Sequence, residues 1–166
     1  MISRSSEYAI RALTYLATQP PERFHLAQDM ARELEIPPAF LGKVLQPLVT
    51  CGILGSQRGR GGGFRLVRPA TEVKLTQIIA TQEDIERRRE CVLGQGACNP
   101  SHPCPLHDPW RSRVDSFLAL LETTSLADLL RHRRDHPEST YPFPIHTAEA
   151  GPAAKGAQAT GPSALR

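Results

Sequence analysis

The sequence has no apolar run approaching the roughly 18 residues that a membrane-spanning helix requires. It also lacks the unbroken apolar core of a secretory signal peptide, because Glu7 and Arg11 interrupt the apolar pattern of residues 1–19. No nucleophile stands with a nearby base at a recognisable spacing, which argues against an enzyme. We therefore expect a cytoplasmic protein that is not an enzyme and has no membrane partner.

The four cysteines lack the tight Cys-x2-Cys pairs of most structural zinc sites. Three of them, Cys91, Cys98 and Cys104, are separated by six and then five residues. Glycines and prolines between them break helices and strands, so we expect a loop that bends back on itself. Grouped cysteines in the cytosol bind metals or act in catalysis more often than they form disulfides. The loop therefore predicts a soft metal centre, and its wide spacings favour an iron–sulfur cluster, with zinc as the alternative.

The fourth ligand of such a centre is left open by the sequence. His107 lies three residues after Cys104, and His102 is nearer still. Glu7 is far away in the sequence, but a carboxylate on the first helix could reach the loop through space. Each has a simpler explanation, since lone histidines are often structural and Glu7 suits the first turn of a helix. The fourth cysteine, Cys51, is expected to be a buried core thiol and not a ligand.

Positive charge is concentrated in the N-terminal part. Residues 1–76 carry ten basic and six acidic side chains, whereas residues 77–135 carry eight and nine. Apolar residues at helical spacing predict helices over residues 4–18, 26–34 and 38–50.

Several residues mark the ends of these helices. Ser5 or Ser6 can cap the first helix, and Pro38 suits the first position of the third. Pro47 predicts a bend or an early end of the third helix, because an interior proline loses a backbone hydrogen bond. Gly52 is the expected stop.

An arginine- and glycine-rich turn follows, flanked by alternating residues, which predicts a β-hairpin. Two closely spaced helices and then a basic hairpin are typical of a winged helix-turn-helix domain, assigned to residues 1–76. Such a domain places a helix in the major groove, while the arginines of its wing neutralise phosphates. The candidate DNA-contacting residues are Pro38, Ala39, Phe40, Lys43, Arg58, Gly59, Arg60, Gly61 and Arg65.

The second part of the chain, residues 77–134, is expected to contain the cysteine loop between helices. One helix is predicted over residues 75–90, and another from Pro109 to Glu122, with Asp108 as its cap. The latter carries an apolar stripe that needs a partner surface, formed by Trp110, Val114, Phe117, Leu118 and Leu121. Ser125 and Asp128 predict a capping box for a last short helix over residues 126–133. Residues 135–166 are predicted to be a disordered tail. The expected fold class is therefore mainly α with a small β-hairpin.

These motifs together resemble the Rrf2 family of bacterial transcription regulators. The similarity runs from Glu7-Tyr8-Ala9-Ile10-Arg11 through Arg58-Gly59-Arg60-Gly61-Gly62-Gly63 to Cys104-Pro105-Leu106-His107, and it spans about residues 1–132. It implies a winged helix-turn-helix followed by a long dimerisation helix, a homodimer, and binding to a double-stranded DNA operator. In cluster-binding members, three cysteines of this loop hold a [2Fe–2S] or [4Fe–4S] cluster. The resemblance assigns Cys91, Cys98 and Cys104 as ligands, and places both His107 and Glu7 at positions where different subfamilies have the fourth.

Two rival functions are considered. A DNA-binding regulator could use the cysteines without a cluster, as oxidant-reactive thiols or as zinc ligands. A protein of another class, an iron–sulfur electron-transfer or carrier protein, would show no specific duplex binding.

Overall fold

The computed structural model describes residues 2–143. The helices are α1 (Arg4–Ala17), α2 (Ala27–Glu33), α3 (Pro38–Thr50), α4 (Leu75–Ala80), α5 (His107–Thr123) and α6 (Leu126–Asp135). A two-stranded sheet is formed by β1 (Leu54–Gln57) and β2 (Gly63–Leu66), and a short 3-10 helix, η1, spans Ile85–Arg89. The predicted mainly α fold with a small hairpin is confirmed. None of the described helices is long and apolar enough to cross a bilayer.

The N-terminal helices enclose one apolar core. Ala9, Ala12 and Leu13 of α1 are fully buried, as are Leu41 and Leu45 of α3. These positions recur at helical spacing, so the three predicted helices form where the pattern indicated. Ser3, and not Ser5 or Ser6, caps α1: its hydroxyl accepts the Ser6 N–H at 3.1 Å.

The third helix continues through Pro47 to Thr50, so of the bend or early end predicted at Pro47, the early end is wrong. Pro47 removes one backbone donor, but Leu48 behind it is fully buried and anchors the last turn in the core. Gly52 follows the C-cap as the expected stop, with a φ of 73°, and the N–H of Ile53 donates to the Leu48 carbonyl at 3.0 Å. Cys51 is exposed, which contradicts the predicted core thiol, because it is the C-cap residue.

The hairpin is antiparallel, with a register from Leu54 opposite Leu66 to Gln57 opposite Gly63. On the other side of β2, His25 forms a bridge with Phe64, a pairing that the sequence did not indicate. The backbones approach closely here, since a Cβ on Gly63 would lie 2.2 Å from the His25 carbonyl oxygen. The base of the wing is thereby fixed to His25, two residues before α2.

The single helix predicted over residues 75–90 is wrong. The chain leaves α4 at Ala80 and starts η1 only at Ile85. Glu83, in between, turns back to α1, where its carboxylate accepts the Ser3 N–H at 2.7 Å and the Ser6 hydroxyl at 2.6 Å. These bonds satisfy the start of α1 and require Glu83 to leave the helical path.

The fifth helix begins at His107, two residues before the predicted Pro109, and Asp108 lies in its first turn instead of capping it. Pro109 is tolerated because backbone donors in a first turn have no helical acceptor. The last helix begins with the predicted capping box, in which Asp128 accepts the Ser125 N–H at 2.8 Å.

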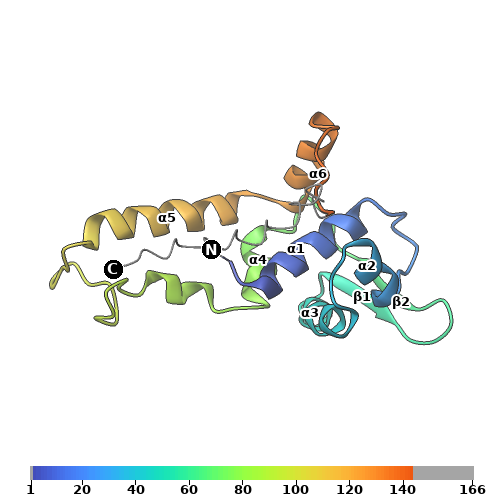
Figure 1. Ribbon diagram of the computed structural model, residues 1–166, viewed down its shortest axis with the longest axis horizontal. Helices are drawn as coiled ribbons and strands as arrows, with labels where there is room; N and C mark the ends of the chain where they lie inside the picture. Colours follow the sequence, from blue (N-terminus) through green and yellow to red (C-terminus); the bar gives the residue numbers. More distant parts are fainter. Residues whose placement is uncertain (1, 144–166) are drawn as a thin grey trace, which may run out of the picture.

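Figure 1 shows α5 extending away from the helical domain beside η1, with the cysteine loop at the far end of this arm. The apolar stripe of α5 is largely covered within one chain: Val114, Leu118 and Leu121 are 6%, 7% and 5% exposed. On this side, α5 lies against α4 and η1. The stripe is thus buried at these three positions, while Leu120 is an exposed large apolar residue on the same helix.

The start of the predicted disordered tail is ordered. Tyr141 and Phe143 pack against the core around α1, and Arg11 donates to the Pro142 carbonyl at 2.8 Å. The rest of that prediction, residues 144–166, lies outside the described residues.

Candidate metal centre

The cysteine segment folds back on itself, as its glycines and prolines predicted. The Cys91 N–H donates to the Gly96 carbonyl at 2.7 Å, and the Gly94 N–H donates to the Cys91 carbonyl at 2.9 Å. Gly94 and Gly96 have φ angles of 78° and 80°, in the left-handed region that glycine adopts without a steric penalty. The loop is therefore a defined turn around Cys91.

Two contacts hold the loop between η1 and α5. The indole N–H of Trp110 donates to the Glu90 carbonyl at 2.9 Å, directly before Cys91. Arg89 pairs with Asp115 of α5 at 2.5 Å. The entry to the loop and the start of α5 are thus fixed to each other.

The three predicted cysteine ligands and His107 are brought together as two pairs. The Sγ atoms of Cys91 and Cys104 lie 3.7 Å apart, and Cys98 Sγ lies 3.1 Å from Nδ1 of His107. All four side chains line one cavity of about 580 Å³. His107 is 7% exposed, so its ring is held in place at the first residue of α5.

Within residues 2–143, no group of three or more His, Cys, Asp or Glu side chains is already arranged to hold a metal ion. A lone zinc ion would need four donors converging on one point. Three thiols and an imidazole around one cavity are donors that either a zinc ion or an iron–sulfur cluster can use. The residues present therefore fit either group by their chemistry.

The local environment shifts the pKa values of Cys91 and Cys104, the two thiols of the first pair, in opposite directions. Backbone N–H groups of Gln95 and Leu93 lower the pKa of Cys91. The Leu106 N–H acts in the same direction on Cys104, but burial and the neighbouring Cys91 outweigh it and raise the pKa of Cys104.

The other two candidates for the fourth ligand, His102 and Glu7, do not contact the cysteines in this structure as His107 does. His102 lines the same cavity but is exposed. Glu7 does not line the cavity of its own chain. It lies on α1, where its carboxylate oxygens are 3.1 Å from Arg4 and 3.7 Å from Arg11.

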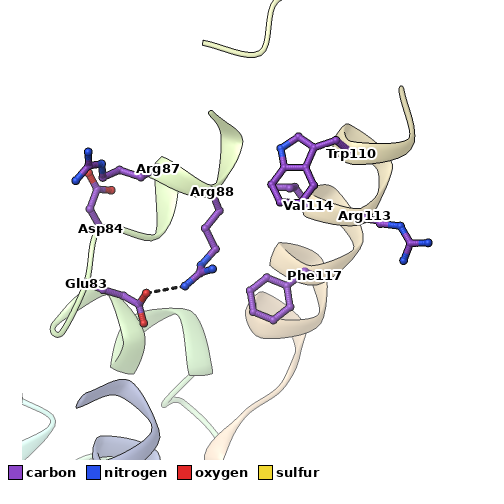
Figure 2. Close-up of a pocket in the computed structure, with 8 residues that line it drawn as sticks. All are labelled: Glu83, Asp84, Arg87, Arg88, Trp110, Arg113, Val114 and Phe117. Atoms are coloured by element: carbon purple, nitrogen blue, oxygen red, sulfur yellow. Dashed lines mark hydrogen bonds and ion pairs between the residues drawn. The ribbon is translucent and has the colours of Figure 1, made fainter. Parts of the chain in front are cut away.

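The arm is joined to α1 through Glu83, a residue that the sequence did not single out. Figure 2 shows its carboxylate paired with Arg88 of η1, at 2.8 Å, beside a hollow of about 610 Å³ between η1 and α5. Arg88 lies over the ring of Phe117, 5.9 Å from its centre, on the other side of this hollow. Burial alone would raise the pKa of Glu83, but bonds from Ser6, Ser3 and Arg88 lower it to about 2. No motif or spacing around Glu83 gave a signal of this role in the sequence.

The candidate DNA-contacting residues lie at the opposite end of the molecule from the loop (Figure 1). Pro38, Ala39, Phe40 and Lys43 of α3 are exposed, as are Arg58, Gly59, Arg60 and Gly61 at the tip of the wing. Phe40 also packs edge-on against Tyr8, with ring centres 5.7 Å apart. Arg65 is partly buried: its guanidinium donates to the Pro21 carbonyl at 3.2 Å and lies over Phe24. Eight of the nine candidates are thus accessible, and Arg65 also supports the base of the wing.

Comparison with known proteins identifies the family. Residues 2–132 match the family model of Rrf2, described as an iron-dependent transcriptional regulator. An HTH-type transcriptional regulator of Mycobacterium tuberculosis is 35% identical over 130 residues, which cover 77% of this chain and 80% of that protein. The HTH-type transcriptional regulator NsrR of Geobacillus kaustophilus is 29% identical over 133 residues, covering 80% and 90%. Among solved structures, CymR, the global cysteine regulator of B. subtilis, has a similar fold, with a TM-score of 0.67 at 23% identity, covering 80% of this chain and 97% of CymR. The chain therefore belongs to the Rrf2 family of helix-turn-helix transcriptional regulators and is not an enzyme.

Proposed function

We propose that operator binding by this regulator responds to an iron–sulfur cluster held by Cys91, Cys98, Cys104 and His107. The observation that carries the proposal is the pairing of these four side chains around one cavity. Between the two fourth ligands that the sequence left open, this geometry favours His107 over Glu7 of the same chain. The cluster, [2Fe–2S] or [4Fe–4S], would supply a centre whose charge and ligation change with redox state, iron supply or nitric oxide.

The residues around the loop suit it to pass such a change onward. Cys91 follows Glu90, whose carbonyl is bonded to Trp110, so a shift of the loop acts on both η1 and α5. From η1, Arg88 and Glu83 connect to the start of α1. Coupling of two sites requires an element that both can bias, and η1 is connected to the loop through Glu90 and to the start of α1 through Arg88 and Glu83.

DNA recognition is proposed for the exposed face of α3 and for the wing. Lys43 and the start of α3 would enter the major groove, while Arg58 and Arg60 would contact phosphates. We further propose that two copies form a homodimer and read two half-sites, because the spacing of two recognition helices then sets the operator spacing. Exposed Leu120 on α5 is a candidate for the contact between the copies.

A second candidate is a regulator that senses oxidants directly through its thiols. The 3.7 Å between the sulfurs of Cys91 and Cys104 favours it. A peroxide would take two electrons and accept the two thiol protons as the Cys91–Cys104 bond forms, leaving alcohol and water. An electron-carrier function is disfavoured by membership of a transcriptional regulator family.

Anaerobic purification followed by visible absorption and by iron, sulfide and zinc assays tests the proposal. We expect a coloured, iron-containing protein that loses its colour and changes its DNA affinity on exposure to oxygen or nitric oxide. A colourless, iron-free protein that still binds DNA would contradict the cluster and leave the thiol or zinc alternative. A coloured protein without any duplex binding would contradict the DNA-binding half of the proposal.

A further inference from the structure

One arginine of α1 joins three distant parts of the chain. The Arg11 side chain is only 13% exposed. Its guanidinium donates to the carbonyl of Leu34 and, at 2.8 Å, to the carbonyl of Pro142. These acceptors lie 23 and 131 positions away, and neither contact was expected from the sequence.

The first acceptor belongs to the turn between α2 and α3. Leu34 is the fully buried C-cap of α2, and Glu35 after it has a φ of 52°, in the left-handed region. That conformation is unfavourable for residues other than glycine and persists where surrounding contacts hold it. The N–H of Ile36 closes the turn by donating to the Ala31 carbonyl at 2.9 Å. Arg11 adds a cation to the carbonyl end of α2, where positive charge is stabilising.

The second acceptor is presented by a short segment after α6, Tyr141–Phe143, which we call the strap. The Tyr141 side chain is partly buried against the core around α1, and this burial raises the pKa of its phenol, although Thr14 of α1 acts in the opposite direction. The ring of Phe143 stands edge-on to the ring of Tyr15, with 6.3 Å between the two ring centres. The Arg133 guanidinium lies 5.7 Å from the centre of the Phe143 ring. Both aromatic rings are therefore fixed against α1, and the Pro142 carbonyl between them is held in front of Arg11.

We propose that the strap is a working part of the DNA-binding domain, and that Arg11 is the positioning residue through which it holds the α2–α3 turn. The direction of α3 depends on this turn, since α3 starts at Pro38 directly after it. Releasing the strap removes one of the acceptors of Arg11 and exposes its guanidinium to water. The turn then loses part of its support, and α3 is presented to DNA less accurately. The proposal rests on the DNA-binding function proposed above.

The test uses the full chain with the strap released by the double substitution Tyr141→Ser and Phe143→Ser. Its first readout is hydrogen exchange, which does not involve DNA. We expect faster exchange at the amide of Ile36 and unchanged exchange at the amide of Leu126, which donates to Val73 at 2.8 Å, away from the turn. Equal exchange at Ile36 with and without the strap overturns the proposal.

The second readout is affinity for a duplex selected from a random pool by the wild-type chain. Strap release is expected to weaken binding about tenfold, and Arg11→Met by a similar factor, consistent with the loss of a charged hydrogen bond. Because both changes act on the same contact, combining them should weaken binding little further than either alone. Losses that multiply would show that the strap acts independently of Arg11 and would overturn its role as the link.

Two controls keep these results interpretable. Tyr141→Phe keeps the ring and loses only the hydroxyl, so it should behave like the wild type in both readouts. Arg11→Lys keeps the charge with fewer donors, and serves if Arg11→Met does not fold, with a smaller loss of affinity expected. If the wild-type chain selects no duplex, the DNA-binding function fails, whereas the exchange result at Ile36 still decides the role of the strap.

Discussion

Replacing Glu83 by glutamine removes the charge that joins the cysteine-loop arm to α1 while keeping the shape of the side chain. The carboxylate accepts bonds from Ser3, Ser6 and Arg88, which lower its pKa from 4.5 to about 2. A tenfold change in the acid dissociation constant corresponds to about 1.4 kcal/mol, so about 3 kcal/mol is the upper limit of the contribution to the free energy of unfolding. Since the glutamine can keep some of these bonds, we expect a loss of about 2 kcal/mol near pH 7.

The contribution of Glu83 to stability depends on pH in a defined direction. A carboxyl group whose pKa is lowered on folding stabilises the protein above its unfolded pKa, and this contribution disappears as the pH falls toward the folded pKa. The difference between wild type and Glu83→Gln should therefore be full at about pH 7 and shrink steadily between about pH 4.5 and about pH 2.

Urea unfolding of both proteins at about pH 7, 5 and 3 measures this difference. The matched control is Glu86→Gln, which removes a carboxylate that is 70% exposed and pairs with Arg89. Such a surface pair contributes about 0–1 kcal/mol, so the control should lose little at any pH. The reasoning would be refuted if the loss in free energy of unfolding caused by Glu83→Gln stayed constant down to about pH 3. It would also be refuted if Glu86→Gln caused an equal loss.

Three further predictions concern the loop, the wing and the last helix. Cys98→Ala should abolish visible absorbance and bound iron in anaerobically purified protein, whereas Cys51→Ala, an exposed thiol outside the loop, should retain both; equal iron in the two would contradict the assignment of ligands. Arg58→Ala and Arg60→Ala should each lower the slope of log affinity against log salt by about 1, measured by fluorescence anisotropy, and unchanged slopes would show that the wing tip does not contact phosphates. Ser125→Ala should cost about 1 kcal/mol in urea unfolding, because the hydroxyl and Asp128 form the capping box of α6, and no loss would mean that the cap is dispensable.

The parts of this molecule that depend on local sequence were predictable. Periodic apolar residues located α1, α2 and α3, the glycine-rich turn located the hairpin, and Ser125 with Asp128 located the start of α6. Spacing also identified the three cysteines and His107 that line the cavity. In each case, the residues that determine the structure are close together in the chain.

Features that depend on distant contacts were missed. Glu83 breaks a plausible helix because its best partners, Ser3 and Ser6, lie 80 and 77 positions earlier. In the sequence Arg11 only interrupts an apolar pattern, although its acceptor Pro142 is 131 positions away. No periodicity within one segment carries such information, since it arises only when the chain has folded.

The chain contains a single tryptophan, and its indole bonds to the carbonyl next to Cys91. All tryptophan fluorescence of this protein therefore originates at the junction of η1, α5 and the cysteine loop. Intrinsic emission can follow the state of the loop in real time without a label, and bound iron nearby would quench it. Trp110 is therefore an intrinsic fluorescent probe at the junction between the proposed sensor loop and the helices η1 and α5.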